Sequence, residues 1–275
     1  MNKRLAGLIA IVVGFAATYA NAQVSLTGTS YAQNFDSMGS AGTTTPTGWT
    51  VDSTANSAAA TGVTDPPVNT GAVSATTTVV AGTGSSVTGA NYNFGVAGTN
   101  VVGERALGSL ASAGNQRDSY VSFTNNTGLI ISQFSLSYDG EQWRVGDTTT
   151  AVNVLTLQYS ATGLSGSWVA LGSGFNFTSP ITTGGPGALD GNAAANRAAG
   201  IGGTYVPGAN IANGSSFYLR WADPDDGGSD NGMATDNFNI TLTLVPEPGT
   251  WLAGGLMLVG LISSQRRRLV RLVCR

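Results

Sequence analysis

A dense group of acidic side chains lies between Trp221 and Phe238, and hard oxygen donors of this kind are typical calcium ligands. Two carboxylate charges about 4 Å apart repel each other by ~1 kcal/mol in water and by ~4 kcal/mol at an effective dielectric of ~20. Gathered aspartates must therefore spread into solvent or share a cation, and Ca²⁺ accepts oxygen ligands from a flexible loop. The candidate calcium ligands are Asp223, Asp225, Asp226, Asp230 and Asp236.

A purely structural role is the alternative for the same aspartates. Their spacing departs from the EF-hand pattern, because Gly227 stands where a ligand is needed and no glutamate occupies the twelfth position. Asp and Gly also form solvated turns in which the carboxylate accepts hydrogen bonds from its own backbone. The sequence leaves both a calcium loop and an Asp/Gly turn open.

A second candidate site surrounds Trp143, whose neighbours Glu141 and Arg144 are charged. An aromatic ring stacks on the face of a sugar, while carboxylate and guanidinium groups bind its hydroxyls. These three residues are therefore candidates for a concave carbohydrate-binding face. The alternative is that they form structural ion pairs and loop anchors.

Glu104 and Glu141 are the only glutamates between residues 23 and 245. A retaining glycosidase needs two carboxyl groups ~5 Å apart, and an inverting glycosidase needs a wider separation. These two residues are consequently the pair that a carboxylate-based glycan hydrolase would use. We regard this as a less favoured alternative to a binding or structural function.

The residues that are missing exclude several kinds of chemistry. The chain has no histidine, and its one cysteine is Cys274. A Ser-His-Asp triad, a Cys-His pair and a zinc site of the usual Cys/His type therefore cannot form. Residues 23–245 carry five arginines, no lysine and fourteen acidic residues, a net charge of −9. Nucleic acid is not expected as a partner, because phosphate binding needs clustered basic residues.

The pattern of apolar residues predicts β-strands that would position these candidates. Apolar and polar residues alternate in three segments, which is typical of strands with one buried face. Further strands are expected from more apolar or shorter segments, and the whole predicts an all-β, jelly-roll or lectin-like antiparallel β-sandwich over residues 23–245. The three alternating segments are 133–138, 216–221 and 237–244, and the further strands are 120–124, 152–159, 168–171 and 174–177.

Residues 53–99 differ from the rest of the sandwich. They are rich in Ala, Thr, Gly and Ser, carry one charge at Asp65, and contain Pro66-Pro67. We expect long loops of low complexity here, with weak strands at 76–80 and 92–94. A disordered linker is the alternative.

The first 22 residues have the pattern of a secretory signal peptide. Lys3 and Arg4 precede an apolar run from Leu5 to Ala17, and Ala20-Asn21-Ala22 forms an A-x-A cleavage site before Gln23. This pattern predicts export through the Sec machinery.

The C-terminal residues 246–275 combine three features. Pro246-Glu247-Pro248 precedes a short apolar segment, residues 250–264, and the basic cluster Arg266-Arg267-Arg268 follows. A helix over the apolar segment would be about 22 Å long, shorter than the ~30 Å hydrocarbon core of a bilayer. Arginines beside an apolar span stay in the cytoplasm, so the preceding residues should face outward. We expect a short hydrophobic helix that anchors the chain transiently in the inner membrane.

This tail resembles the PEP-CTERM sorting signal of Gram-negative bacteria that make exopolysaccharide. The resemblance implies that exosortase, a membrane-embedded cysteine protease, recognises the Pro-Glu-Pro motif and removes or transfers the tail. Three blocks are more loosely similar to other exported proteins with such a tail, which implies a shared β-sandwich. They are residues 104–110, residues 140–144 and residues 219–238.

The sequence thus predicts an exported protein that exosortase delivers to the cell surface or extracellular matrix. We expect it to be non-enzymatic and associated with exopolysaccharide and biofilm. The alternative is a carbohydrate-binding module that could depend on calcium.

Overall fold

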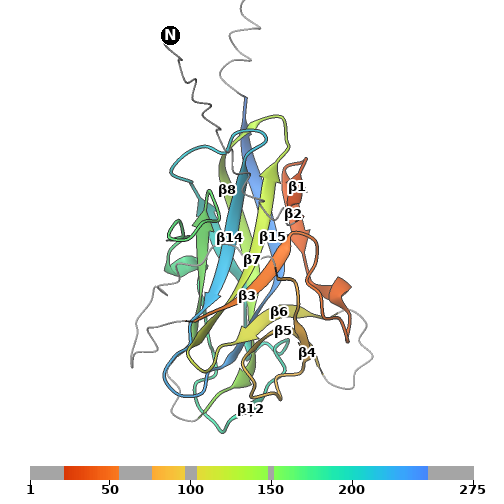
Figure 1. The fold of residues 1–275 in the computed structure, drawn as a ribbon, viewed down its shortest axis with the longest axis vertical. Coiled ribbons are helices and arrows are strands. Elements are labelled where there is room, and N and C mark those ends of the chain that lie inside the picture. The colour runs from red at the N-terminus through yellow and green to blue at the C-terminus, as the bar shows by residue number, and fades with distance from the viewer. Residues whose placement is uncertain (1–21, 56–75, 97–103, 148–151, 247–275) are drawn as a thin grey trace, which may run out of the picture.

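The computed structural model describes residues 22–55, 76–96, 104–147 and 152–246 (Figure 1). The described residues form fifteen strands and two short 3-10 helices. The long strands β7, β8, β14 and β15 run along the longest axis of the molecule, and the short strands β4, β5, β6 and β12 lie toward one end. None of the helices in these four ranges is both long and apolar enough to cross a membrane.

The first sheet has seven strands among the described residues, in the order β1-β7-β14-β9-β10, with β3 also paired to β7 and β11 to β9. Every pair in it is antiparallel except β1 with β7. Its strands are β1 (Val24–Leu26), β3 (Trp49–Ala55), β7 (Asn115–Asn125), β9 (Val154–Ser160), β10 (Val169–Ala170), β11 (Phe177–Thr178) and β14 (Ser216–Asp223).

The second sheet has eight strands among the described residues, in the order β12-β8-β15-β6-β5-β4, with β13 also paired to β8 and β2 to β15. Its central pair joins the two longest strands of the second sheet. The strands are β2 (Ser30–Gln33), β4 (Val80–Gly82), β5 (Ala90–Phe94), β6 (Ala106–Leu110), β8 (Ile130–Val145), β12 (Gly187–Ala188), β13 (Arg197–Tyr205) and β15 (Gly232–Val245). The 3-10 helices are η1 (Asp36–Met38) and η2 (Ser173–Phe175).

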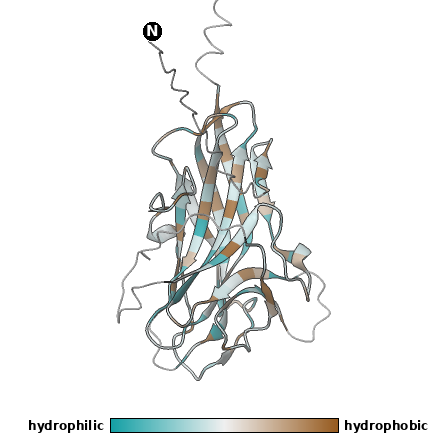
Figure 2. Ribbon diagram, viewed as in Figure 1, coloured by the Kyte–Doolittle hydropathy of each residue, from teal (hydrophilic) through white to brown (hydrophobic). Residues whose placement is uncertain are grey.

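The main hydrophobic core lies between the two sheets and is rich in aromatic rings. Trp221 of β14 stacks on Trp49 of β3, with ring centroids 5.4 Å apart, and packs edge-on against Phe238 of β15 at 5.5 Å. Phe123 and Phe217 stack at 4.9 Å. All five of these side chains are at most 1% exposed. Figure 2 shows apolar segments recurring along the long strands with polar segments between them, and the predicted all-β, antiparallel β-sandwich is confirmed.

A second, smaller core lies on the other face of the second sheet. Met233 belongs to the main core, and its neighbour Ala234 packs in the smaller cluster, because successive side chains of a strand point to opposite faces. Phe94 of β5 and Trp143 of β8 stack in this cluster with centroids 5.7 Å apart. Both faces of this part of the sheet are therefore covered.

Most of the predicted strands are present. The segments 120–124, 133–138, 216–221 and 237–244 lie inside β7, β8, β14 and β15, and the segments 152–159 and 168–171 overlap β9 and β10. The strand expected at 174–177 is mostly wrong, because residues 173–175 form η2 and the strand β11 begins only at Phe177. In the segment 53–99, β3 continues to Ala55 and β5 covers the strand expected at 92–94, while β4 begins only at Val80. Residues 56–75 lie outside the described ranges.

An extra residue interrupts the pairing of β15 with β8. Asp236 lies opposite Asp139, but the next paired residues are Asn239 and Ser137, so β15 advances three residues while β8 advances two. Asn237 has a φ of 49° at this bulge, and its amide donates to Asp139 Oδ2 at 3.2 Å. The bulge reverses the alternation of β15, so Ala234 and Asp236 share one face while Phe238 and Ile240 enter the main core on the other.

We predict that Asn237→Val destabilises the protein by about 1–2 kcal/mol, because a β-branched residue tolerates positive φ poorly. Asn237→Gly should retain most of the stability, since glycine adopts this conformation without steric cost. Asn239→Val is the matched control, because Asn239 is also exposed on β15 and its φ is not positive. Thermal unfolding of the three variants checks the prediction, and equal stabilities of the two valine variants would contradict it.

Candidate functional site

Three carboxylates from three separate segments meet on the face of the second sheet turned away from the main core. Glu104 lies two residues before the strand β6, Glu141 lies in β8, and Asp236 lies in β15 between these two strands. Ala234 is paired with Glu141, so Asp236, two residues further along, is a diagonal neighbour of Glu141 on the same face. One oxygen from each carboxylate lies within 4.8 Å of the other two. We call these three residues the carboxylate triad.

Two neighbouring side chains hold the oxygens of Glu141. The indole Nε1 of Trp143 donates to Glu141 Oε2 at 2.9 Å. The amide of Asn192 lies against the other oxygen: with its nitrogen turned inward it donates to Glu104 Oε1 at 2.9 Å and to Glu141 Oε1 at 3.3 Å. The triad is thus bounded by an indole on one side and by an amide on the other.

Burial shifts the proton affinity of the triad. Glu141 is 0% exposed and Asp236 is 2% exposed. Burial raises the pKa of Glu141 to about 7, and repulsion from Glu104 and Asp139 adds to it, while the indole of Trp143 and the charge of Arg197 oppose it. Burial likewise raises the pKa of Asp236 to about 8, with repulsion from Glu141, Glu104 and Asp36. The pKa of the half-buried Glu104 is raised for the same reasons.

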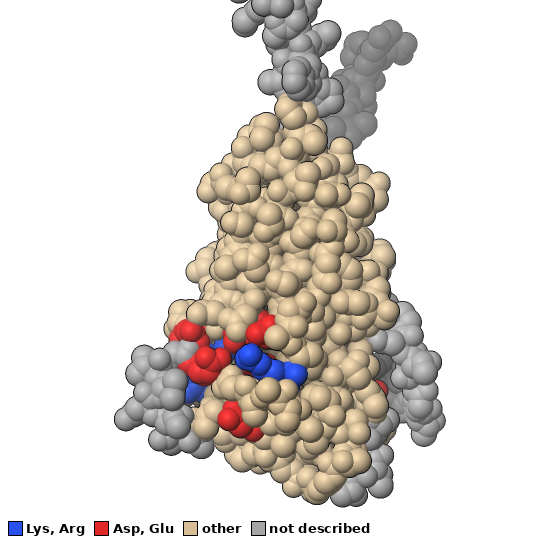
Figure 3. Space-filling model, turned by 180° about the vertical axis from the view of Figure 1, so that it is seen from behind, with Lys and Arg blue, Asp and Glu red and all other residues tan. Residues whose placement is uncertain are grey.

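Charged residues around the triad are predominantly acidic. Asp36 and Asp139 add negative charge near it, and Arg197 supplies positive charge. The guanidinium of Arg197 lies 4.0 Å from Asp139 and is itself partly exposed. Figure 3 shows that acidic and basic side chains gather in one zone of the face opposite that of Figure 1, while most of the visible surface carries neither.

The five candidate calcium ligands divide between two places. Asp223 is the last residue of β14, and Asp225, Asp226 and Asp230 lie in the loop before β15. Asp236 lies inside β15, where it is a member of the triad. The first four influence one another electrostatically. We call these four residues the aspartate loop. The sequence did not show that Asp236 lies in a strand rather than in the loop, because apolar and polar residues do not alternate strictly at the start of β15.

Groups of the protein hold each carboxylate of the aspartate loop. Ser109 donates to Asp223 at 2.7 Å, the backbone N–H of Gly114 donates to Asp225 at 2.5 Å, and Asn153 donates to Asp226. The N–H of Asp226 donates to Asp230 at 3.1 Å. These contacts agree with the structural alternative that the sequence left open. Calcium binding by these aspartates stays a prediction.

The carbohydrate-stacking role expected of Trp143 is wrong in this structure. Its ring is 1% exposed and lies between Phe94 and the backbone of Gly191, so no sugar can stack on it. Glu141 is buried in the triad, and Arg144 is 8% exposed and donates to the backbone oxygen of Gly84 at 3.2 Å. Arg144 is thus a loop anchor, as the alternative held, while neither Arg144 nor Glu141 forms an ion pair among the described residues.

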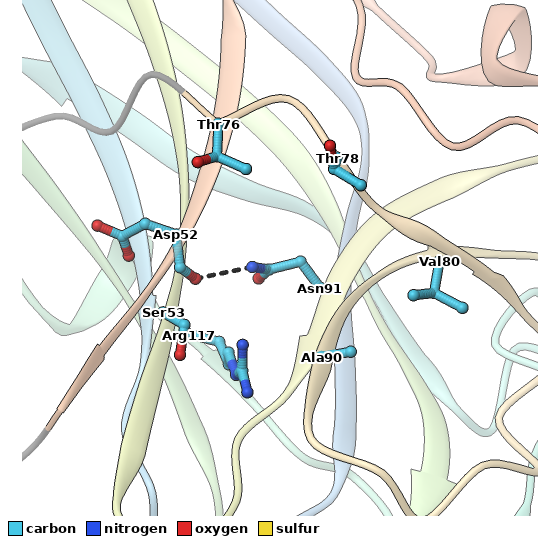
Figure 4. Close-up of a pocket in the computed structure, with 8 residues that line it drawn as sticks. All are labelled: Asp52, Ser53, Thr76, Thr78, Val80, Ala90, Asn91 and Arg117. Atoms are coloured by element: carbon cyan, nitrogen blue, oxygen red, sulfur yellow. Dashed lines mark hydrogen bonds between the residues drawn. The ribbon is translucent and has the colours of Figure 1, made fainter.

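A polar pocket of about 440 Å³ opens between the two sheets at a different place (Figure 4). The amide of Asn91 donates to the backbone oxygen of Asp52 at 2.7 Å, and Arg117 donates to the backbone oxygen of Gly89 at 3.0 Å. Asn91 Oδ1 and Arg117 Nε have no hydrogen-bond partner among the described residues. The pocket is lined by Asp52, Ser53, Thr76, Thr78, Val80, Ala90, Asn91 and Arg117.

Sequence reasoning missed this pocket because its lining comes from β3, β4, β5 and β7, which are distant in the sequence. None of these segments has a motif. The only signal was a surplus of hydroxyl and amide residues in the low-complexity region.

The residues of the expected sorting signal fall almost entirely beyond the described ranges. Pro246 is the last described residue. Glu247, Pro248, the apolar segment 250–264, the cluster Arg266-Arg267-Arg268 and the expected signal peptide lie outside them, so sorting stays a prediction.

No protein-family model and no curated protein matches the chain. Among solved structures, it is similar to the K2 cleaved adhesin domain of Lys-gingipain, with 15% identity and a TM-score of 0.40 over 78% of this chain and 98% of that one. It is also similar to the CBM22-1 xylan-binding domain of Paenibacillus barcinonensis Xyn10C, with 12% identity and a TM-score of 0.32 over 77% of this chain and 92% of that one. Such low TM-scores do not indicate what this chain binds.

We predict that stability falls as the pH rises through the titration of Asp223. Burial raises the pKa of Asp223 to about 8, and repulsion from Asp226 and Asp118 adds to this, while Ser109 opposes it. The unfolded chain releases this proton near pH ~4, so the folded state holds the extra proton between about pH 4 and 8. The stabilisation it provides is complete below about pH 4 and is lost as the pH rises toward 8.

Asp223→Asn removes this titration and leaves an oxygen for Ser109. Urea unfolding at pH 5 and at pH 8 should show a smaller decrease in the free energy of unfolding for the variant than for the wild type. The same decrease in both proteins would refute the assignment.

Proposed function

We propose that this chain is an exported surface or extracellular-matrix protein that binds secreted polysaccharide without cleaving it. The observation that carries the proposal is the polar pocket between β3 and β5. Its volume of about 440 Å³ lies within the range of small-molecule sites, which is roughly 300–1,000 Å³.

The lining of the pocket suits the hydroxyl groups of a sugar. Asn91 contributes an amide group and Arg117 a guanidinium group to its wall. Hydroxyls of Ser53 and Thr78 lie nearby, and Val80, which is 50% exposed, supplies an apolar contact. Among the described residues no aromatic side chain lines the pocket, so we expect recognition by hydrogen bonds with modest affinity per sugar unit.

The geometry of the glutamates supports a binding function over hydrolysis. A glycosidase must present both of its carboxyl groups to the glycosidic bond. Glu141 is 0% exposed, and Trp143 occupies one of its oxygens. The close approach of Glu104 and Glu141 thus brings two carboxyls together at a place that a polysaccharide chain does not reach.

Export and sorting follow from the two ends of the sequence. The signal peptide would direct the chain through the Sec machinery, and exosortase would then process the Pro-Glu-Pro tail after transient anchoring in the inner membrane. The net charge of −9 for residues 23–245 supports a protein that avoids anionic partners such as nucleic acid. Such a domain would stay soluble within a hydrated matrix.

We predict that filling the pocket with Thr78→Trp lowers polysaccharide binding about tenfold, which corresponds to ~1.4 kcal/mol. The full-length chain would be made in an exosortase-positive host, and its co-sedimentation with that host's secreted polysaccharide would be measured. Thr241→Trp is the matched control, because Thr241 is an exposed strand residue of β15 that does not line the pocket.

The same samples test the absence of cleavage. The number of reducing ends in the polysaccharide should stay constant during incubation with the protein. An increase that Glu141→Gln abolishes would favour the hydrolase alternative, and equal binding by the two tryptophan variants would remove the pocket from the proposal.

Deletion of residues 246–275 should prevent delivery to the surface or matrix, because the deletion removes the motif, the apolar segment and the arginines together. Fractionation of the exosortase-positive host, with the intact chain as the control, measures this. Unchanged delivery of the shortened chain would disprove sorting by the tail.

A further inference from the structure

The carboxylate triad lies in surroundings that are short of positive charge. Five acidic residues interact there, namely Glu104, Glu141, Asp236, Asp36 and Asp139. Arg197 opposes them at Glu104 and Glu141, and Arg105 acts on Asp36. Both arginines lie at the margin, and neither forms an ion pair within 4.0 Å with a triad carboxylate of the described residues. Three closely spaced carboxylates are thus left without a contacting protein cation.

A buried oxygen of the triad also lacks a partner. Asp236 is 2% exposed, and its Oδ1 accepts no hydrogen bond from any described residue. Leaving a buried polar atom unsatisfied costs about 1–3 kcal/mol, and more for a charged group. The atom belongs to the side chain that lies between Glu104 and Glu141, so a ligand at the centre of the triad would satisfy it.

The side chain of Asn192 is a fourth polar group at the triad. Its terminal amide lies 2.9 Å from Glu104 Oε1 and 3.3 Å from Glu141 Oε1. With the nitrogen inward it bridges the two carboxylates as a donor, and with the oxygen inward it adds a fourth oxygen to the group. A flip of this amide would therefore adapt the same residues to a protonated triad or to a bound cation.

We propose that Glu104, Glu141, Asp236 and the amide oxygen of Asn192 form a binding site for Ca²⁺. The ligands are hard oxygens, and the chain has no histidine to recruit a softer metal. Oxygens that share one Ca²⁺ at ~2.3–2.6 Å lie up to ~5 Å apart, which accommodates the 4.8 Å limit within the triad.

This site is distinct from both the aspartate loop and the polysaccharide pocket. The triad shares none of its residues with the pocket. In the aspartate loop, Ser109, Gly114 and Asn153 donate to the carboxylates, while at the triad Trp143 donates to Glu141 and the backbone N–H of Asn237 donates to Asp236. The ion would therefore join β6, β8 and β15 whether or not the pocket binds a sugar.

The test compares thermal unfolding of the full-length chain in EDTA and in about 10 mM CaCl₂. With a dissociation constant of ~10⁻⁴ M, this concentration shifts the unfolding equilibrium about a hundredfold and raises the Tm by roughly 5–10 °C. Glu141→Gln and Asp236→Asn keep the shape of the side chain and should each abolish most of this increase. Both variants should remain folded in EDTA, because they remove repulsion.

Asp226→Asn in the aspartate loop is the matched control and should keep the full increase. No calcium-dependent increase in the wild type would overturn the proposal. An increase that survives in Glu141→Gln and Asp236→Asn but disappears in Asp226→Asn would overturn it too, and would place the ion in the aspartate loop.

Terbium(III) occupies calcium sites, and its emission when tryptophan is excited shows whether the bound ion lies near Trp143. The indole of Trp143 donates to a proposed ligand at 2.9 Å, so excitation of tryptophan should sensitise the bound ion. Trp143→Phe should lower this emission several-fold, and Trp168→Phe, which alters a ring over Arg220, should leave it unchanged. Equal emission from the two variants would exclude an ion at the triad.

Discussion

The extra residue in β15 determines which face each side chain of this central strand reaches. Beyond the bulge, Phe238, Ile240 and Leu242 enter the main core. Before it, Ala234 and Asp236 point to the opposite face, where β8 and the segment before β6 supply Glu141 and Glu104. Without the bulge, Asp236 would share a face with Phe238 and would place a carboxylate among aromatic rings. One strand thus supplies both the hydrophobic core and the triad.

Buried charge is accommodated in three different ways in this sandwich. Arg220 is 0% exposed and is balanced within the protein: Asp118 lies 3.8 Å away, Gln158 accepts its Nε–H at 2.7 Å, and the ring of Trp168 covers it. The aspartate loop uses neutral donors such as Ser109. Among the described residues, no arginine lies within 4.0 Å of a triad carboxylate and Asp236 Oδ1 has no donor, so these carboxylates must hold protons or a cation to remain buried.

The sequence predicted the sandwich where alternation is regular, and failed where the backbone or the burial departs from it. Phe134, Leu136 and Tyr138 alternate without interruption and all reach the main core as expected. If apolar and polar positions alternated strictly, Asp236 would share the core face with Phe238, which lies two residues further along. The bulge moves Asp236 to the other face, and the residue types do not predict it. The strand β13 was missed since its residues, mostly Ala and Gly, show no apolar period.

The candidate sites were predicted in part. Glu104 and Glu141 were named only as the pair that a glycan hydrolase would use, and the structure does bring them together, whereas Asp236 was grouped with the aspartates before β15. For Trp143 the sequence left open both an exposed sugar-binding face and a structural role, because its sequence neighbours are polar. Long-range coverage by Phe94 and Gly191 buries it, and no local pattern reports such contacts.

Gly191 links the burial of Trp143 to the position of Asn192. The chain that follows β12 runs along the edge of β8, where the N–H of Leu189 donates to the backbone oxygen of Trp143 at 2.8 Å. A Cβ atom at Gly191 would lie 2.4 Å from the indole ring, so only glycine lets the backbone approach this closely. Asp190 then accepts the N–H of Asn192 at 3.1 Å. The close packing of Gly191 on the Trp143 ring therefore places the side-chain amide of Asn192 beside the carboxylate triad. A bulkier residue at 191 would move this amide away from the triad.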